Sequence, residues 1–154
     1  MRQEMYFRAL KTLANVEIHL GHFLENRRRM PLAEPKPFGP KTVEVIRTEE
    51  KGSDVNLASH LLVDGFRDRY EVAAVITNDS DLTTPIKMVR DELRKTVGIL
   101  NPHMNNPQSQ PSVELRRAAS FFKPISDDAL AASQFPDELT DASGKTFRRP
   151  MNWK

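Results

Sequence analysis

The chain of 154 residues contains no cysteine. This absence excludes a disulfide framework and thiolate chemistry, and it is compatible with a reducing cytoplasm. No apolar run approaches the roughly 20 residues that cross a bilayer, and residues 1–13 lack the apolar centre of a secretory signal. We therefore expect a cytoplasmic protein that makes no use of a membrane.

An excess of charge of one sign is also missing. The formal net charge is only +2, which is too small to indicate a polyanionic partner by itself. The run Arg27-Arg28-Arg29 can form a local positive rim, although such runs usually form a solvated surface. Apolar residues (38%) and charged residues (29%) are balanced as in a globular domain, and the length is enough to bury one core.

Hydrophobic periodicity predicts strands that alternate with helices. Strands are expected over residues 15–20, 42–46, 72–76 and 96–100, and helices over 2–13, 53–69 and from about Pro85 onward. Residues 21–40 are expected to form a loop. This order predicts an α/β fold with a mostly parallel sheet and flanking helices.

The second half of the chain is less regular. Residues 104–111, rich in Asn, Gln and Pro, are typical of a mobile loop. Short helices are expected over 113–119 and 126–132, and an irregular surface tail over 135–154. We assign residues 1–125 to one domain and residues 126–154 to a C-terminal extension.

Two aspartates stand where the apolar strand 72–76 ends. Ligands of open α/β sheets bind beyond the carboxyl ends of the strands. Asp79 and Asp81, two residues apart in a turn, can direct their carboxylates at one hard cation such as Mg²⁺ or Mn²⁺. The alternative is a plain turn in which these side chains cap the following helix.

Asp54 begins the helix over residues 53–69, directly after Lys51-Gly52-Ser53, and it too can be a simple cap. With a rise of about 1.5 Å per residue, His60 lies about 9 Å and Asp64 about 15 Å from Asp54 along the helix axis. Asp64 therefore cannot share a cation with Asp54, and His60 is at the limit of reach.

Two motifs in this order resemble one family. Lys-Gly-x-Asp-Val occurs within Glu50–Ala58, and after one strand Val75–Leu82 contains a polar pair followed by Asp-x-Asp. Together they resemble the NYN domain, in the bacterial LabA-like branch of the PIN-like nuclease superfamily. The blocks 97–102, 118–122 and 131–136 also resemble one bacterial subgroup, so the resemblance extends over nearly the whole chain.

The resemblance implies a PIN-like fold and a metal-dependent ribonuclease that uses Mg²⁺ or Mn²⁺. It assigns the catalytic, metal-binding carboxylates to Asp54, Asp79 and Asp81. In such an enzyme Thr77 and Asn78, which match the family's polar pair, are expected to orient water or phosphate. Lys51 either contacts the RNA backbone or is a solvated surface lysine. A homodimer is compatible with the sequence, and no particular protein partner is indicated.

Two positions depart from the family pattern. Many NYN domains have an aspartate where this chain has His60. Such domains also open with a strand that ends in an Asp-Gly-x-Asn-like element, and nothing in residues 1–20 matches it. We therefore expect an N-terminally incomplete domain, poorly stable or inactive by itself. Two alternatives to the nuclease remain: a non-catalytic RNA-binding or interaction module, and a remnant without activity.

Overall fold

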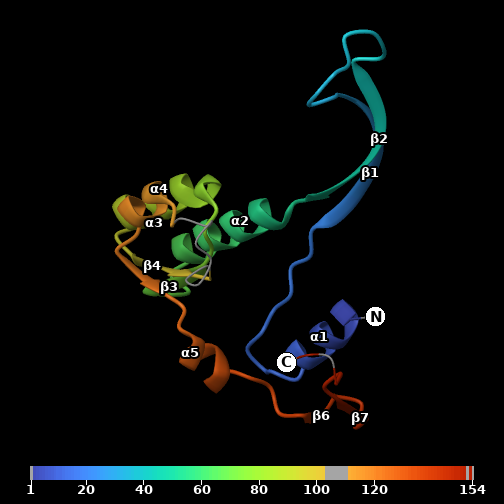
Figure 1. The fold of residues 1–154 in the computed structure, drawn as a ribbon. Coiled ribbons are helices and arrows are strands. Elements are labelled where there is room, and N and C mark those ends of the chain that lie inside the picture. The colour runs from blue at the N-terminus through green and yellow to red at the C-terminus, as the bar shows by residue number, and fades with distance from the viewer. Residues whose placement is uncertain (1, 103–110, 152, 154) are drawn as a thin grey trace.

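The computed structural model describes residues 2–102, 111–151 and 153 (Figure 1). The helices are α1 (Arg2–Leu10), α2 (Ser53–Phe66), the short 3-10 helix η1 (Ser80–Leu82), α3 (Thr83–Asp91), α4 (Val113–Ala118) and α5 (Asp127–Ala132). The strands are β1 (His22–Pro31), β2 (Thr42–Lys51), β3 (Val72–Ile76), β4 (Thr96–Asn101), β5 (Phe121–Pro124), β6 (Glu138–Thr140) and β7 (Thr146–Arg148).

A parallel three-stranded sheet is the centre of the fold. Its order is β3-β4-β5, with Val72 opposite Thr96 and Gly98 opposite Phe121. The helices α2, α3 and α4 pack with it around one core: Leu61, Val75, Leu82, Ile86, Val89, Val97, Ile99, Leu115 and Ala118. The predicted α/β class and the parallel pairing of strands 72–76 and 96–101 are confirmed, and this arrangement is consistent with a PIN-like fold.

Strand β5 was not predicted as a strand. It is only four residues long and ends at a proline, so it carries no periodic signal. Its place is set by a close approach to β4, because a Cβ atom on Gly98 would lie 1.9 Å from the Phe121 ring. The Ser120 hydroxyl also accepts a hydrogen bond from the Val97 amide (3.1 Å).

Three predictions about the first half were wrong. Residues 15–20 form no strand and instead run beside α2. The centroid of the His19 ring lies 3.7 Å from that of the His60 ring, and the Leu20 carbonyl accepts a hydrogen bond from the Asn56 side-chain amide (3.2 Å). The expected loop over 21–40 contains β1. Strand β2 is twice as long as predicted and pairs antiparallel with β1 rather than joining the parallel sheet.

The physical reason for these errors is exposure. Every residue of β1 is exposed to solvent. Because neither face of the strand is buried, its sequence does not show the alternation of apolar and polar residues that predicts a strand. Residues 15–20 do alternate, but none of their side chains is buried, and the contacts of this segment with α2 are made by the His19 ring and the Leu20 carbonyl. Pairing between β1 and β2 depends on backbone hydrogen bonds, which periodicity does not detect.

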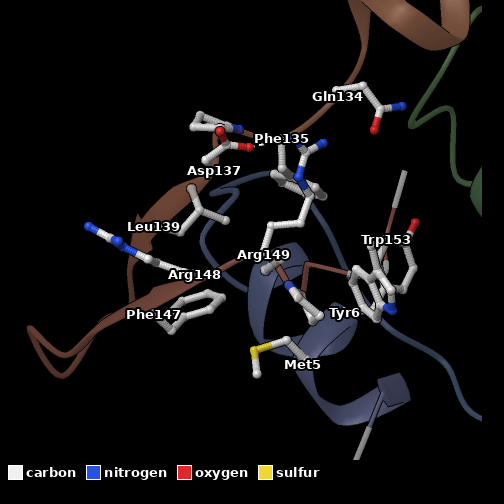
Figure 2. A pocket seen from close by; sticks show the side chains of 13 residues that line it. Met5, Tyr6, Gln134, Phe135, Asp137, Leu139, Phe147, Arg148, Arg149 and Trp153 are labelled. Atoms are coloured by element: carbon white, nitrogen blue, oxygen red, sulfur yellow. Dashed lines mark hydrogen bonds and ion pairs between the residues drawn. The ribbon is translucent and has the colours of Figure 1, made fainter.

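The C-terminal region is more regular than predicted. The tail contains the β6–β7 hairpin, which packs on α1 (Figures 1 and 2). Arg8 of α1 donates from Nε to the Asp141 carboxylate (2.8 Å) and lies 4.1 Å above the Phe147 ring. Between them is a hollow of about 470 Å³ with aromatic walls, lined by Met5, Tyr6, Ala9, Gln134–Asp137, Leu139, Phe147–Pro150 and Trp153.

Residues 103–110, most of the segment predicted to be a mobile loop, lie outside the described residues. Among the residues that are described, none of the helices is both long and apolar enough to span a membrane.

Candidate functional site

The turn from β2 into α2 positions Asp54. Gly52 precedes the helix with φ of 98°, a left-handed conformation that a residue with a side chain adopts only at a cost. The Glu50 carboxylate then accepts hydrogen bonds from the Ser53 amide (3.2 Å) and hydroxyl (2.8 Å). Glu50 thus satisfies a free amide at the helix start, and the Asp54 side chain in the first turn is left exposed.

The turn after β3 positions the other two aspartates. The buried Thr77 hydroxyl accepts from the Asp79 amide (3.0 Å). The Asp79 carboxylate accepts in turn from the Asp81 amide (2.9 Å) and so caps η1. Asn78 accepts from the Ser112 amide (2.9 Å), which ties this turn to the start of α4. These hydrogen bonds fix the backbone that carries Asp81.

Asp54 and Asp81 line the same hollow, although they come from different elements. The hollow measures about 400 Å³, and its lining residues are Glu50, Lys51, Gly52, Asp54, Val55, Ala58, Asp81, Leu82 and Pro85. Of the six candidates from the sequence, Asp54, Asp81 and Lys51 meet here. Asp79, Thr77 and Asn78 do not line the hollow and instead hold the neighbouring turn.

Sequence reasoning missed Glu50 as a residue of this site. Its signal was available, because Glu50 stands three residues before Ser53, immediately ahead of Gly52 and the helix. An acidic side chain at that position is suited to the free amides of a helix start. The buried Asn101, at the carboxyl end of β4, also reaches this edge of the sheet and was not proposed as a site residue.

The hollow contains two carboxylates, those of Asp54 and Asp81, that no neighbouring cation in the described part of the chain neutralises. Within the described residues, neither Asp54 nor Asp81 has an ion-pair partner or a side-chain hydrogen bond. The described residues also contain no group of three or more His, Cys, Asp or Glu side chains arranged to hold a metal. Two carboxylates are a suitable donor set for Mg²⁺, which keeps several waters and commonly uses one or two carboxylates together with substrate phosphates.

Two further candidates on α2 point elsewhere. The His60 ring stacks on His19, and the Asp64 carboxylate pairs with Arg69 (2.9 Å). Neither residue lines the hollow of Asp54 and Asp81. The exclusion of Asp64 from this site, argued from helical rise, agrees with that placement.

The NYN domain profile matches residues 22–126, which include both turns of the site. The chain belongs to the NYN domain family. That family is part of the PIN-like superfamily. The match covers the β1–β2 hairpin, the parallel sheet and the hollow that Asp54 and Asp81 line.

A curated relative is the 6-hydroxy-3-succinoylpyridine 3-monooxygenase HspA of Pseudomonas putida (strain DSM 28022 / S16), 27% identical over 158 aligned residues. The alignment covers 98% of this NYN chain and 50% of the relative, so the chain spans about half the relative's length. A crystal structure of the Vibrio parahaemolyticus RIMD 2210633 protein VPA0982, of unknown function, matches 64% of this chain and 51% of that chain at 15% identity, with a TM-score of 0.43.

Proposed function

We propose that this NYN protein is a metal-dependent ribonuclease that hydrolyses RNA phosphodiester bonds in the hollow lined by Asp54 and Asp81. One observation carries the proposal. Two unpaired carboxylates, from the first turn of α2 and from the turn after β3, line a single hollow with Lys51 beside them. Both turns lie inside the segment matched by a nuclease-like family.

Asp54 and Asp81 are the residues that would hold Mg²⁺ or Mn²⁺, with Asp79 as a further candidate ligand from the adjacent turn. When bound, the cation supplies Lewis-acid chemistry, in which a phosphate oxygen is polarised and a water becomes more acidic. Without it, the two carboxylates would repel the phosphate backbone. Cleavage should therefore require a divalent cation and stop when EDTA is added.

The chain's own residues bind and orient the substrate. Lys51 lines the hollow, and its ammonium also lies 3.5 Å from the Glu49 carboxylate. We expect this ammonium to contact a phosphate that enters the hollow. Thr77 and Asn78 use their side chains to hold the turn that carries Asp79 and Asp81. We propose them as supports of the site, and their direct contact with RNA stays a prediction.

The test is cleavage of a fluorescein-labelled single-stranded RNA with Mg²⁺ or Mn²⁺. We expect Asp54→Asn and Asp81→Asn each to lower the cleavage rate by about 100-fold or more. Loss of a carboxylate would weaken binding of the cation, whose positive charge stabilises the transition state. Asp64→Asn is the matched control, since it removes the same charge from the same helix outside the hollow. Equal rates in all three variants would refute the site.

RNA binding without cleavage in the presence of either cation would support the alternative of a non-catalytic RNA-binding module. In that outcome Asp54→Asn should strengthen RNA binding, because it removes a negative charge from the path of the phosphates. No RNA binding at all would contradict both functions.

A second candidate function rests on the alignment with HspA, which is named as a 6-hydroxy-3-succinoylpyridine 3-monooxygenase and of which this chain matches about half. The aromatic-walled hollow of about 470 Å³ between α1 and the tail has the volume of a small-molecule site. Incubation with 6-hydroxy-3-succinoylpyridine, oxygen and a two-electron donor tests it, since a monooxygenase reduces the second oxygen atom to water. Product formation that is lost in Trp153→Ala and kept in Asp54→Asn would favour this candidate over the nuclease.

A further inference from the structure

The β1–β2 hairpin projects from the rest of the fold (Figure 1). Every residue of β1 is exposed, and most of β2 is exposed as well. Within the described residues, its strands pair with each other and make at most isolated contacts with other elements. Since a lone two-stranded hairpin is only marginally stable in water, this arm gains from a ligand that binds along it.

The strand register divides the charges of the arm between two faces. Directly paired residues share a face, and faces alternate along each strand. Arg47 pairs with Asn26, and Arg28 follows two positions later on β1, opposite Val45. Arg28, Arg47 and Lys51 therefore lie on one face, here called the basic face, where Glu49 is the one carboxylate among the paired residues.

The opposite face of the hairpin has the reverse balance. It has two cationic residues, Arg27 and Arg29, and three carboxylates. The carboxylates are those of Glu25, Glu44 and Glu50. Arg29 is moreover directly opposite Glu44 and donates to the Thr42 hydroxyl (3.1 Å). A polyanion would therefore be attracted to the basic face and not to the other.

A hollow of about 340 Å³ lies on this part of the arm. It is lined by Asn26, Arg28, Arg47 and Glu49 of the basic face, together with Arg27 of the opposite face. Arg47 pairs with Glu49 (2.7 Å), whereas the Arg28 guanidinium has no hydrogen bond or ion pair within the described part of the chain. An exposed, unpaired guanidinium beside a second one presents several N–H donors to an incoming anion.

The basic face is continuous with the candidate active site. Arg47, Glu49 and Lys51 point to the same side of β2 at steps of about 6.6 Å, two residues of strand rise each. Glu49 bridges the row through its contacts with Arg47 and Lys51. Lys51 in turn lines the hollow that contains Asp54 and Asp81.

We propose that the basic face binds the phosphate backbone of the RNA strand whose cleaved bond lies between Asp54 and Asp81. Arg28 and Arg47 contact phosphates, because a planar guanidinium can donate two parallel hydrogen bonds to one phosphate. The identity of the strand as substrate rests on the proposed ribonuclease function. The binding surface itself rests on the register and the charges of the hairpin.

The experiment measures binding of fluorescein-labelled single-stranded RNA in EDTA, where cleavage cannot occur, at several salt concentrations. Each lost phosphate contact should reduce the slope of log K against log salt by about 0.7. We expect Arg28→Ala and Arg47→Ala each to do so, and the double variant to lower affinity on the order of tenfold at moderate salt, an effect that shrinks as salt rises. Arg29→Ala is the matched control, with the same charge change on the other face of the same strand.

Circular dichroism and thermal melting check that the variants fold. If the double alanine variant does not fold, the double variant Arg28→Gln, Arg47→Gln replaces it. Equal slopes in the wild type, the double variant and Arg29→Ala would overturn the proposal. A wild-type dimer that the double variant converts to a monomer, with an unchanged RNA slope, would also overturn it, since the basic face would then join two copies of the chain.

The two proposals fail separately. Slope changes confined to Arg28 and Arg47, without cleavage in Mg²⁺ or Mn²⁺, would refute the ribonuclease and support the binding surface. Cleavage that depends on Asp54 and Asp81, with slopes that do not depend on Arg28 or Arg47, would do the reverse.

Discussion

Asp79 differs from the other two aspartates because its carboxylate already accepts the Asp81 amide at the start of η1. Asparagine is as good a cap as aspartate, whereas alanine typically costs about 1 kcal/mol at such a position. We expect Asp79→Asn to keep the stability of the wild type and Asp79→Ala to lose about that amount. Denaturant unfolding followed by circular dichroism measures the difference.

The same pair of variants separates capping from metal binding. Because asparagine keeps the cap but removes the charge, a ligand role for Asp79 requires both variants to lose cleavage of RNA. Full cleavage by Asp79→Asn would exclude Asp79 from the metal site and leave Asp54 and Asp81 as its carboxylates.

Asp141 provides a prediction about acid. Hydrogen bonds from the Ser143 hydroxyl, from Arg8 and from the Lys145 amide hold the pKa of its carboxyl well below the usual range. A lowered folded pKa stabilises the fold at pH values above the unfolded pKa of about 3.9, and this stabilisation is lost as the pH falls through the folded pKa. Contacts between α1 and the β6–β7 hairpin should therefore weaken in acid, below about pH 4.

Fluorescence of Trp153 during thermal unfolding between pH 2 and pH 7 measures this effect. We expect Asp141→Asn to lower the midpoint of that transition at pH 7 and to reduce its change in acid. Asp128→Asn, an exposed aspartate of α5, is the control. An unchanged acid response in Asp141→Asn would show that other groups control this packing.

At the scale of elements, the contact between β4 and β5 depends on Gly98. Since a Cβ atom there would lie 1.9 Å from the Phe121 ring, Gly98→Ala must displace either the ring or the strand. Overpacking of this kind typically costs 1–3 kcal/mol, so we expect a loss of about that size. In a Phe121→Ala background the same substitution should cost much less, and equal costs in both backgrounds would contradict the contact.

The elements that the sequence predicts well are those with a buried side. Val72–Ile76 and Thr96–Asn101 are apolar strands between helices, and α2 has a clear apolar stripe that contains Leu61. Each is where the periodicity places it, within a few residues. The β1–β2 hairpin could not be predicted in the same way, because its side chains face water on both sides and its pairing depends on the backbone.

The candidate site was predictable in part for a related reason. Asp54 and Asp81 lie close to the ends of α2 and β3, whose positions follow from the hydrophobic pattern. Lys51 ends β2, whose length and pairing that pattern did not give. Glu50 contributes through its hydrogen bonds to Ser53. Such a local interaction depends on the conformation of Gly52, which a pattern of residue types does not determine.

At the scale of the whole molecule, the exposed surface is large. The accessible area is 12,181 Å², whereas a compact monomer of 17.6 kDa exposes about 7,900 Å². The arm contributes to the excess, and so does the separation between the central core and the packing of α1 on the C-terminal hairpin. The helix α5 that leads to this hairpin has no buried residue.

This division predicts two unfolding transitions. Trp153, the single tryptophan of the chain, packs edge-on against Tyr6 with ring centroids 6.4 Å apart, and so reports the α1 region. Far-UV circular dichroism reports mainly the core helices α2, α3 and α4, with a smaller contribution from α1 and α5. Among the described residues, α1, β6 and β7 make at most isolated contacts with the core elements. We therefore expect tryptophan fluorescence to change at lower denaturant than circular dichroism, which a single two-state transition does not allow.

Two substitutions assign the transitions. Leu115 is fully buried in the central core, so Leu115→Ala should cost about 2–5 kcal/mol and move only the circular dichroism midpoint. Tyr6→Ala should move only the fluorescence midpoint, because it removes a wall of the hollow between α1 and the tail. If both probes instead move together in either variant, the regions unfold as one cooperative unit, and the packing of α1 on the β6–β7 hairpin stabilises the core that carries Asp54 and Asp81.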